Sequence, residues 1–373
     1  MRPFSLAVEG WREINHSFAL VNQYQLLELK QYPQIRLFHD DLPLFDPRWS
    51  REHNNAGFST GQQAQIRSVP PFPGGRADVV YRIGFPFRLQ AADAGRLVVF
   101  VTSENHKFYP QDFHPGPRDD AARVVTPSSW SRSGLLENGF RDVEVVPHGV
   151  DPAIFRPVDA LEAQRYRSSL GIDGGVMFLN VSAMSFNKGV DLLIVAFCTL
   201  RQKYEDIRLV LKDQSNLYGA TAKALVEDLK RQLPHLLTRD ALAAIHLLSR
   251  NLDLSELRLL YGAADAYVSP YRAEGFNLPP LEAAACGTPI IVTGGGSTDD
   301  YFDASLALRV DSRRMSSDEL GIYLEPSLEH LVANMEAIIL EQAKFDLEAG
   351  RRRVAERFSW NQATRRLVDV MTS

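Results

Sequence analysis

Cysteine is scarce in this sequence. Cys198 and Cys286 are the only two among 373 residues, and each follows a run of apolar neighbours. So few cysteines exclude a small disulfide-stapled scaffold. We interpret both as small core residues, and a disulfide between them is the less favoured alternative.

Long apolar runs are missing as well. No stretch approaches the roughly 18 apolar residues that a transmembrane helix needs. The first residues run into Glu9, Arg12 and Glu13 without the apolar segment of a signal peptide. We therefore expect a cytoplasmic protein, with the inner face of the membrane as an alternative location.

An excess of positive charge is also absent. Forty-one Lys and Arg residues against 46 Asp and Glu residues give a net charge of -5, which argues against a partner among nucleic acids. A membrane contact would depend on local patches. The apolar share of 45% is ordinary for globular proteins and excludes disorder. At about 150 residues per domain, the length predicts two or three domains.

What the sequence does contain is a regular alternation of short apolar strands and helices after Asp151. We expect strands over 176–181, 207–211, 244–248, 265–269 and 289–293, separated by helices over 189–204, 219–232, 254–263 and 279–287. This alternation is typical of a parallel sheet with right-handed crossovers. It predicts an α/β fold.

The first 150 residues are less regular. Strands are expected near 4–8, 78–81, 97–101 and 143–146, a helix over 17–30 with Ser17 as its N-cap, and loops over 40–76, which are rich in Pro, Gly, Asn and Asp. We expect two α/β domains joined near residues 148–160.

The stretch from Ser269 to Pro289 carries the most chemistry. Glu274 lies in a turn directly after a strand, and the glycine that follows permits close backbone approach. The expected helix N-terminus, with Asn277 as N-cap, turns several backbone N–H groups outward, which makes an anion site suited to a diphosphate. The residues of this predicted site are Gly275, Phe276, Asn277 and Leu278.

A second glutamate follows eight residues after Glu274. Glu282 lies on the expected helix, where its carboxylate can accept the paired hydroxyl groups of a ribose. Glu274 would then reach whatever lies beyond the phosphates. The alternative is a helix with two solvated glutamates.

With its setting, this stretch resembles the family 4 (group 1) retaining glycosyltransferases, whose pattern is two glutamates separated by seven residues. Segments 145–151, 187–197, 263–270 and 358–362 resemble further motifs of that family in the same order. The likeness is specific over residues 145–373 and only architectural over 1–144.

The resemblance implies a GT-B fold, in which two Rossmann-like domains with parallel sheets face each other across a cleft. It assigns residues 1–150 to an acceptor-binding domain and 151–355 to a domain that binds the nucleotide sugar. Residues 356–373 would form a C-terminal helix that packs back on the N-terminal domain.

The same resemblance implies that Lys188 neutralises the diphosphate as it leaves; a solvated lysine at a helix start is the alternative. Ser182 is a further candidate to bind the donor. Ala183 stands where the family usually has a second cation, an arginine. Lys212, directly after the strand over 207–211, is a candidate to supply the missing charge, and a plain surface lysine is the alternative. The nucleotide base is expected near residues 247–251 and 271–272.

The N-terminal half offers weaker candidates. Asn15, His16 and Ser17 follow the first expected strand and could contact the donor phosphates, with helix capping as the alternative. His106 follows another strand and could approach the reacting sugar, unless it is structural.

We therefore expect a retaining hexosyltransferase that moves a sugar from a UDP- or GDP-sugar to a hydroxyl of a sugar, lipid-linked or polypeptide acceptor in glycan, polysaccharide or glycolipid assembly. No Asp-x-Asp follows a strand, so no metal cofactor is expected. The alternatives are a non-catalytic nucleotide-sugar-binding subunit and a GT-B sugar-nucleotide epimerase. A dinucleotide oxidoreductase is disfavoured because no Gly-x-Gly-x-x-Gly follows the first strand.

Overall fold

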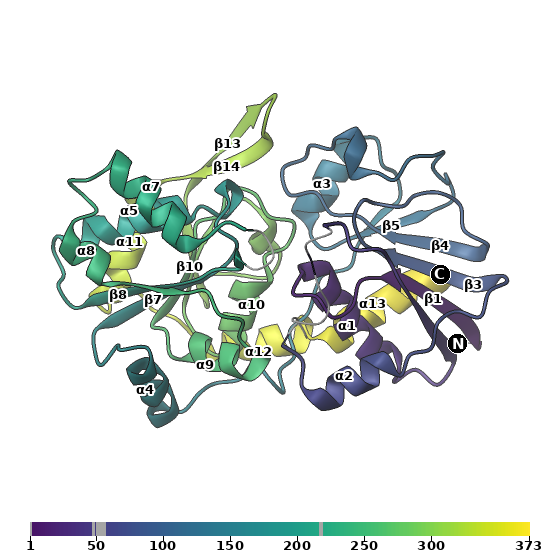
Figure 1. Cartoon of the computed structure of the whole chain (residues 1–373), viewed down its shortest axis with the longest axis horizontal. Helices are drawn as coiled ribbons and strands as arrows, with labels where there is room; N and C mark the ends of the chain where they lie inside the picture. The colour runs from purple at the N-terminus through teal and green to yellow at the C-terminus, as the bar shows by residue number, and fades with distance from the viewer. Residues whose placement is uncertain (1, 47–48, 50–56, 216–218) are drawn as a thin grey trace. The chain divides into compact units, whose positions relative to one another are not determined.

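Two parallel six-stranded sheets organise the chain (Figure 1). The computed structural model describes residues 2–46, 49, 57–215 and 219–373. The chain divides into two compact units, Met1–Gly149 with Ser359–Ser373, and Val150–Phe358. Each unit is a parallel sheet with helices, so the expected α/β fold is confirmed.

The first unit has the sheet order β2-β1-β3-β4-β5-β6. Its strands are β1 (Phe4–Gly10), β2 (Ile35–Asp41), β3 (Ala77–Ile83), β4 (Ala94–Phe100), β5 (Arg123–Thr126) and β6 (Val143–Val145). Its helices include α1 (Ser17–Leu29), α2 (Thr60–Arg67), the short η1 (Pro110–Asp112) and α3 (Ser129–Glu137). The apolar runs at 79–81 in β3 and 97–100 in β4 are buried on both faces, as expected for continuous apolar strands.

Five of these elements, β2, β5, η1, α2 and α3, were not expected from the sequence. The helix α2 lies inside the segment predicted as loops, and it buries only Ile66 among its residues. Its start is marked by a capping box between Ser59 and Gln62, a local signal that the many turn-forming residues obscured. The strand β5 and the helix α3 are short elements whose pattern is too brief to identify by periodicity.

The C-terminal helix α13 (Trp360–Thr372) belongs to the first unit. Its buried face packs on α1, where the rings of Tyr24 and Trp360 stack with centroids 4.8 Å apart. Arg123 donates a hydrogen bond to the Val370 carbonyl at 3.0 Å. The end of the chain therefore completes the unit in which the chain starts.

The second unit has the sheet order β12-β11-β10-β7-β8-β9. Its strands are β7 (Val176–Val181), β8 (Ile207–Lys212), β9 (Ile245–Leu248), β10 (Ala266–Ser269), β11 (Ile290–Thr293) and β12 (Ala307–Val310). The strand order reverses between β7 and β10. In open α/β sheets, ligands bind outside the carboxyl ends of the strands at such a switch point.

Helices join and cover these strands. They are α4 (Ala160–Ser169), the short η2 (Phe186–Lys188), α5 (Val190–Arg201), α7 (Ala222–Gln232), α8 (Arg239–Ala243), α9 (Leu254–Gly262), α10 (Leu278–Ala285), η3 (Ser297–Asp300), α11 (Leu328–Ile339) and α12 (Leu347–Arg357). The predicted helices correspond to α5, α7, α9 and α10, which confirms the crossover pattern.

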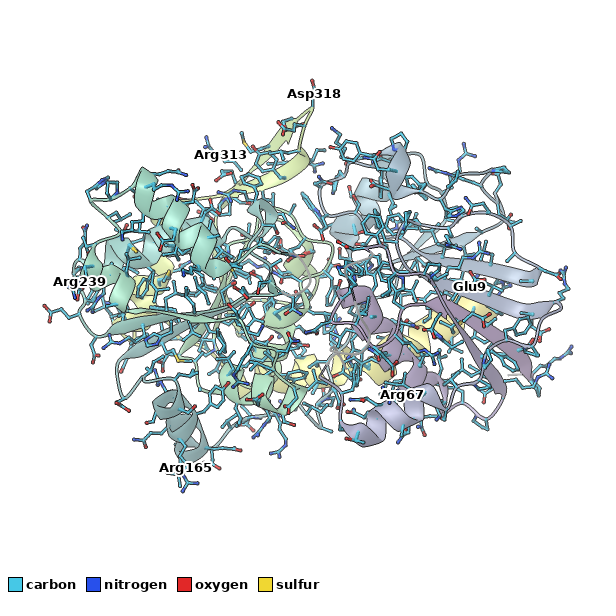
Figure 2. All side chains as sticks on the ribbon, in the orientation of Figure 1. Glu9, Arg67, Arg165, Arg239, Arg313 and Asp318 are labelled. Atoms are coloured by element: carbon cyan, nitrogen blue, oxygen red, sulfur yellow. The ribbon has the colours of Figure 1, made fainter. Side chains whose placement is uncertain are left out.

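An antiparallel hairpin projects from the second unit (Figure 1). It consists of β13 (Ser312–Ser317) and β14 (Gly321–Pro326), and Figure 2 shows Arg313 and Asp318 on it. The sequence analysis missed it because the segment Ser-Arg-Arg-Met-Ser-Ser has no apolar alternation. Pairing with β14, not its own pattern, makes this segment a strand.

Both cysteines lie in the core of the second unit as free thiols. Burial raises the pKa of the Cys198 thiol to about 12, which keeps it protonated and inert. The interpretation as core residues is confirmed. Within the described part of the chain, no helix is both long and apolar enough to cross a membrane.

Candidate active site

Two loops meet at the switch point of the second sheet. One is the turn η2 after β7, and the other follows β10. Gly189 ends the turn with φ +67°, and a Cβ at this position would lie 1.9 Å from the Pro270 carbonyl oxygen. Only glycine permits this approach, so the turn lies directly on the second loop.

Hydrogen bonds join the two loops. The Asn187 carbonyl accepts from the backbone N–H groups of Arg272 at 2.7 Å and Ala273 at 3.1 Å. The neighbouring Lys188 Nζ lies 2.6 Å from Glu274 Oε1. Their side chains are only 19% and 9% exposed. Two residues predicted to act on phosphate and on sugar are thus brought together by tertiary structure.

The start of α10 lies beside this pair. Asn277 occupies the N-cap position, as predicted, but with φ +73°. Its side-chain amide donates to Ser269 Oγ at 3.0 Å, so it does not cap the helix by its side chain, as the sequence had suggested. The first N–H groups of a helix lack intrahelical acceptors, so an anion is a suitable partner for those of Asn277 and Leu278.

Tyr301 orients the backbone at this helix start. Its hydroxyl lies 2.8 Å from the Phe276 carbonyl oxygen and 2.6 Å from that of Asn277. In a trans peptide the N–H points opposite to the carbonyl. The N–H groups of Asn277 and Leu278 therefore point away from Tyr301, which is the geometry that the predicted diphosphate site requires.

Glu282 lies on α10 and is buried. The Tyr261 hydroxyl donates to its Oε2 at 2.8 Å. Burial raises the pKa of the Glu282 carboxyl to about 7, although the Tyr261 hydrogen bond opposes the rise. Glu274 is also buried, so the alternative of two solvated glutamates is wrong.

Lys212 is buried at the carboxyl end of β8, with 4% of the residue exposed. It pairs in register with Val181, and its backbone carbonyl accepts from Ser182 N at 3.1 Å. Its ammonium donates to the Asp213 carbonyl, and burial lowers its pKa. The plain surface-lysine alternative is wrong, because Lys212 is buried at the carboxyl end of its strand, next to Ser182.

Asp213 was missed by the sequence analysis. Its buried carboxylate accepts from Ala222 N at 2.9 Å and from Ser249 Oγ at 2.9 Å. A carboxylate beside Lys212 keeps a positive charge acceptable in a buried place. The signal available in the sequence was an Asp directly after an apolar strand, which alone is not specific.

The expected position of the base near residues 271–272 is not supported. Tyr271 is buried, and its hydroxyl lies 2.9 Å from Thr298 Oγ1. The Arg272 guanidinium is buried between Asp191 and Glu325. Both side chains serve the packing of the second unit, which periodicity and motif spacing do not reveal.

Comparison with known proteins agrees with this geometry. Residues 162–307 match the family model described as glycosyl transferases group 1. The D-inositol 3-phosphate glycosyltransferase of Pseudarthrobacter chlorophenolicus is 31% identical over 206 residues, which are 52% of this chain and 44% of that protein. Residues 162–307, within the second unit, therefore carry a group 1 glycosyltransferase domain.

Two further proteins resemble this chain. The alpha-monoglucosyldiacylglycerol synthase of Streptococcus pneumoniae is 30% identical over 179 residues, which are 47% of this chain and 38% of that protein. The chain thus spans less than half the length of both curated relatives. The crystal structure of Anabaena HepE with UDP-glucose is 14% identical, covers 99% of both chains and gives a TM-score of 0.67, which shows the GT-B fold.

In the first unit, His16 is the N-cap of α1. Its Nδ1 accepts from Phe18 N at 3.1 Å, and its ring packs against Trp11 and Trp49 with centroids 5.2 Å apart. The capping alternative therefore holds for His16. Ser17, expected as the cap, is instead the first helical residue and is exposed, while Asn15 is half-buried in the preceding loop.

His106 does not take the expected place facing a sugar. Its side chain is 0% exposed, and its Nδ1 lies 2.9 Å from Glu137 Oε2 on α3. A Cβ on Gly134 of the same helix would lie 2.7 Å from the imidazole Cδ2. The unpredicted helix α3 covers the ring, so we interpret His106 as structural.

His148 precedes the passage into the second unit. Its ring stacks on Phe100 with centroids 5.5 Å apart, and burial lowers its pKa to about 3.

Within residues 2–46, 49, 57–215 and 219–373, no group of three or more His, Cys, Asp or Glu residues is placed to hold a metal ion.

Proposed function

We propose that this glycosyltransferase moves a sugar from a nucleoside-diphosphate donor to a hydroxyl acceptor with retention at the anomeric carbon and without a metal ion. The observation that carries the proposal is the Lys188–Glu274 pair, which lies beside the start of α10. A cation, a carboxylate and outward N–H groups match the three parts of such a donor.

Each part of the donor has a partner in this arrangement. The N–H groups of Asn277 and Leu278 bind the diphosphate, and Lys188 adds positive charge to it. Glu282 accepts hydrogen bonds from the ribose hydroxyls, and Glu274 holds a hydroxyl of the sugar. A UDP-sugar is the first donor to test because HepE was solved with UDP-glucose.

Lys188 supplies the catalytic electrostatics in this proposal. As the bond between the sugar and the diphosphate breaks, negative charge grows on the diphosphate, and an ammonium already in place stabilises it. The leaving diphosphate takes the proton of the acceptor hydroxyl on the same face of the sugar. No protein nucleophile is needed, and Glu274 keeps the sugar oriented.

The acceptor is assigned to the first unit. One relative is named for D-inositol 3-phosphate and another for monoglucosyldiacylglycerol, so related proteins use acceptors of different chemistry. We propose a hydroxyl acceptor in glycan, polysaccharide or glycolipid assembly, with the protein in the cytoplasm or at the inner face of the membrane.

A panel of UDP-glucose, UDP-N-acetylglucosamine and GDP-mannose tests the proposal through slow hydrolysis of the donor. We expect one donor to be cleaved, with the released sugar first appearing as the anomer of the donor in NMR spectra. Release of the opposite anomer would overturn retention. Binding without cleavage by wild type and by Lys188→Ala alike would instead favour the non-catalytic binding subunit, which the alanine at position 183 keeps open.

A further inference from the structure

We propose that Arg272 is a positioning residue that sets the place of Lys188 and links it to the β13–β14 hairpin. The inference rests on the proposed function, because it concerns how the donor diphosphate is held. Arg272 lies two residues before Glu274 and is 4% exposed.

The guanidinium of Arg272 holds both ends of the segment that carries Lys188. Its Nη1 and Nη2 donate to the two carboxylate oxygens of Asp191 at 2.7 and 2.8 Å, in the first turn of α5. Nη1 also donates to the Phe186 carbonyl at 3.1 Å, and the guanidinium carbon lies 4.2 Å from the centroid of the Phe186 ring. Lys188 lies between these two anchor points.

The hairpin is joined to the same arginine. Arg272 Nε donates to Glu325 Oε2 at 3.1 Å, and the Arg272 carbonyl accepts from Leu324 N at 2.8 Å. Tyr323 lies edge-on to Phe186 with centroids 5.8 Å apart. A movement of β14 would therefore be transmitted to the turn that carries Lys188.

Arg272 does not replace the arginine missing at Ala183. A guanidinium has five N–H donors, and those of Arg272 are directed at five acceptors: the two oxygens of Asp191, the two of Glu325 and the Phe186 carbonyl. The residue therefore acts on a phosphate only through Lys188. Lysine, a single point charge, cannot make this fork.

A double-mutant cycle tests this indirect action. Binding of UDP and GDP is measured by calorimetry for wild type, Arg272→Gln, Lys188→Ala and the double variant. We expect Arg272→Gln to weaken the better of the two ligands about tenfold in the wild-type background and less than twofold in the Lys188→Ala background. An equal loss in both backgrounds would show a general structural role and overturn the inference.

Two further variants keep the test decisive if Arg272→Gln does not fold. Arg272→Lys retains the charge without the fork, and Glu325→Gln removes only the link to the hairpin. Each of these two variants should weaken UDP or GDP binding several-fold when Lys188 is present, but not in the Lys188→Ala background. Unchanged binding by both variants would also overturn the inference.

The matched control is Arg167→Gln. Arg167 donates to the Gly175 carbonyl and to Asp265 at 2.7 Å each, in the same unit but at the amino ends of β7 and β10. It should leave UDP and GDP binding unchanged. If wild type binds neither nucleotide while correctly folded, the proposed function itself fails, which is distinguishable from failure of the coupling alone.

Discussion

The ammonium of Lys188 lies 2.6 Å from the carboxylate of Glu274, although the two residues are 86 positions apart. The cation proposed to stabilise the leaving diphosphate is thus paired with the carboxylate proposed to orient the sugar. When one member of a buried ion pair is removed, the other charge is left uncompensated. The pair can therefore be tested one member at a time.

Glu274→Gln should separate binding from turnover. Because Lys188 is then no longer shared with a carboxylate, affinity for UDP or GDP should rise several-fold in calorimetry. Donor hydrolysis should slow at least tenfold, because the sugar loses its charged acceptor. The control is Glu336→Gln, which breaks the exposed Lys203–Glu336 pair of 2.7 Å and should change neither quantity. Equal losses of affinity and rate would contradict the assigned roles.

Glu282 should make nucleotide binding depend on pH. With its pKa near 7, the carboxyl is mostly protonated at pH 6 and mostly ionised at pH 8. Since ribose hydroxyls donate to the ionised form, UDP or GDP affinity should rise about tenfold between these values in wild type. Glu282→Ala and Glu282→Gln should bind more weakly at pH 8 and lose this rise, whereas a parallel rise in all three would assign it to the phosphate.

The Glu282 carboxyl should make the folded state less stable as pH rises, although it strengthens nucleotide binding over the same range. Its folded pKa lies above the ordinary value of 4.5, so the folded state binds the proton more tightly. This contribution is complete below pH 4.5 and is lost as pH rises through 7. The free energy of unfolding of Glu282→Gln, taken relative to wild type, should therefore be higher at pH 8 than at pH 5, by at most about 3 kcal/mol. Denaturant unfolding at both pH values measures this difference.

Lys188→Ala and Lys212→Ala should each slow turnover roughly tenfold to a hundredfold, because a charge-assisted hydrogen bond contributes about 1.5–3 kcal/mol. The double variant should be slower than either. Lys223→Ala on the exposed face of α7 is the control. A full-rate Lys212→Ala enzyme would mean that Ala183 leaves a real gap in the phosphate site.

Tyr301→Phe should loosen the start of α10. The lost hydroxyl holds the carbonyls of Phe276 and Asn277, and one hydrogen bond contributes about 1 kcal/mol, so affinity for UDP or GDP should fall roughly fivefold. Tyr166→Phe is the matched control, since it removes a buried tyrosine hydroxyl on α4. If both variants bind like wild type, Tyr301 does not orient the anion site.

Metal independence is tested most directly by removing divalent cations. Donor hydrolysis should be unchanged when EDTA is added, because Lys188 and the start of α10 supply the positive potential. Loss of activity that manganese or magnesium restores would contradict this.

The sequence by itself determined the alternation of strands and helices in the second unit. Buried parallel strands are continuous apolar runs, and these persist whatever the tertiary contacts are. It also determined where Glu274, Glu282 and Lys188 lie along the chain, since a turn, a helix start and a spacing of eight are local features.

Only the tertiary structure decided which of these residues meet. Lys188 faces Glu274 because Gly189 lets one loop lie on the other, a contact between residues distant in sequence. His106 is covered by α3, whose existence the local pattern did not reveal. Arg272 was expected near the nucleotide base, but its buried guanidinium instead pairs with Asp191 of α5 and Glu325 of β14. Side-chain partners depend on how crossovers stack neighbouring strands, and a one-dimensional pattern does not contain that arrangement.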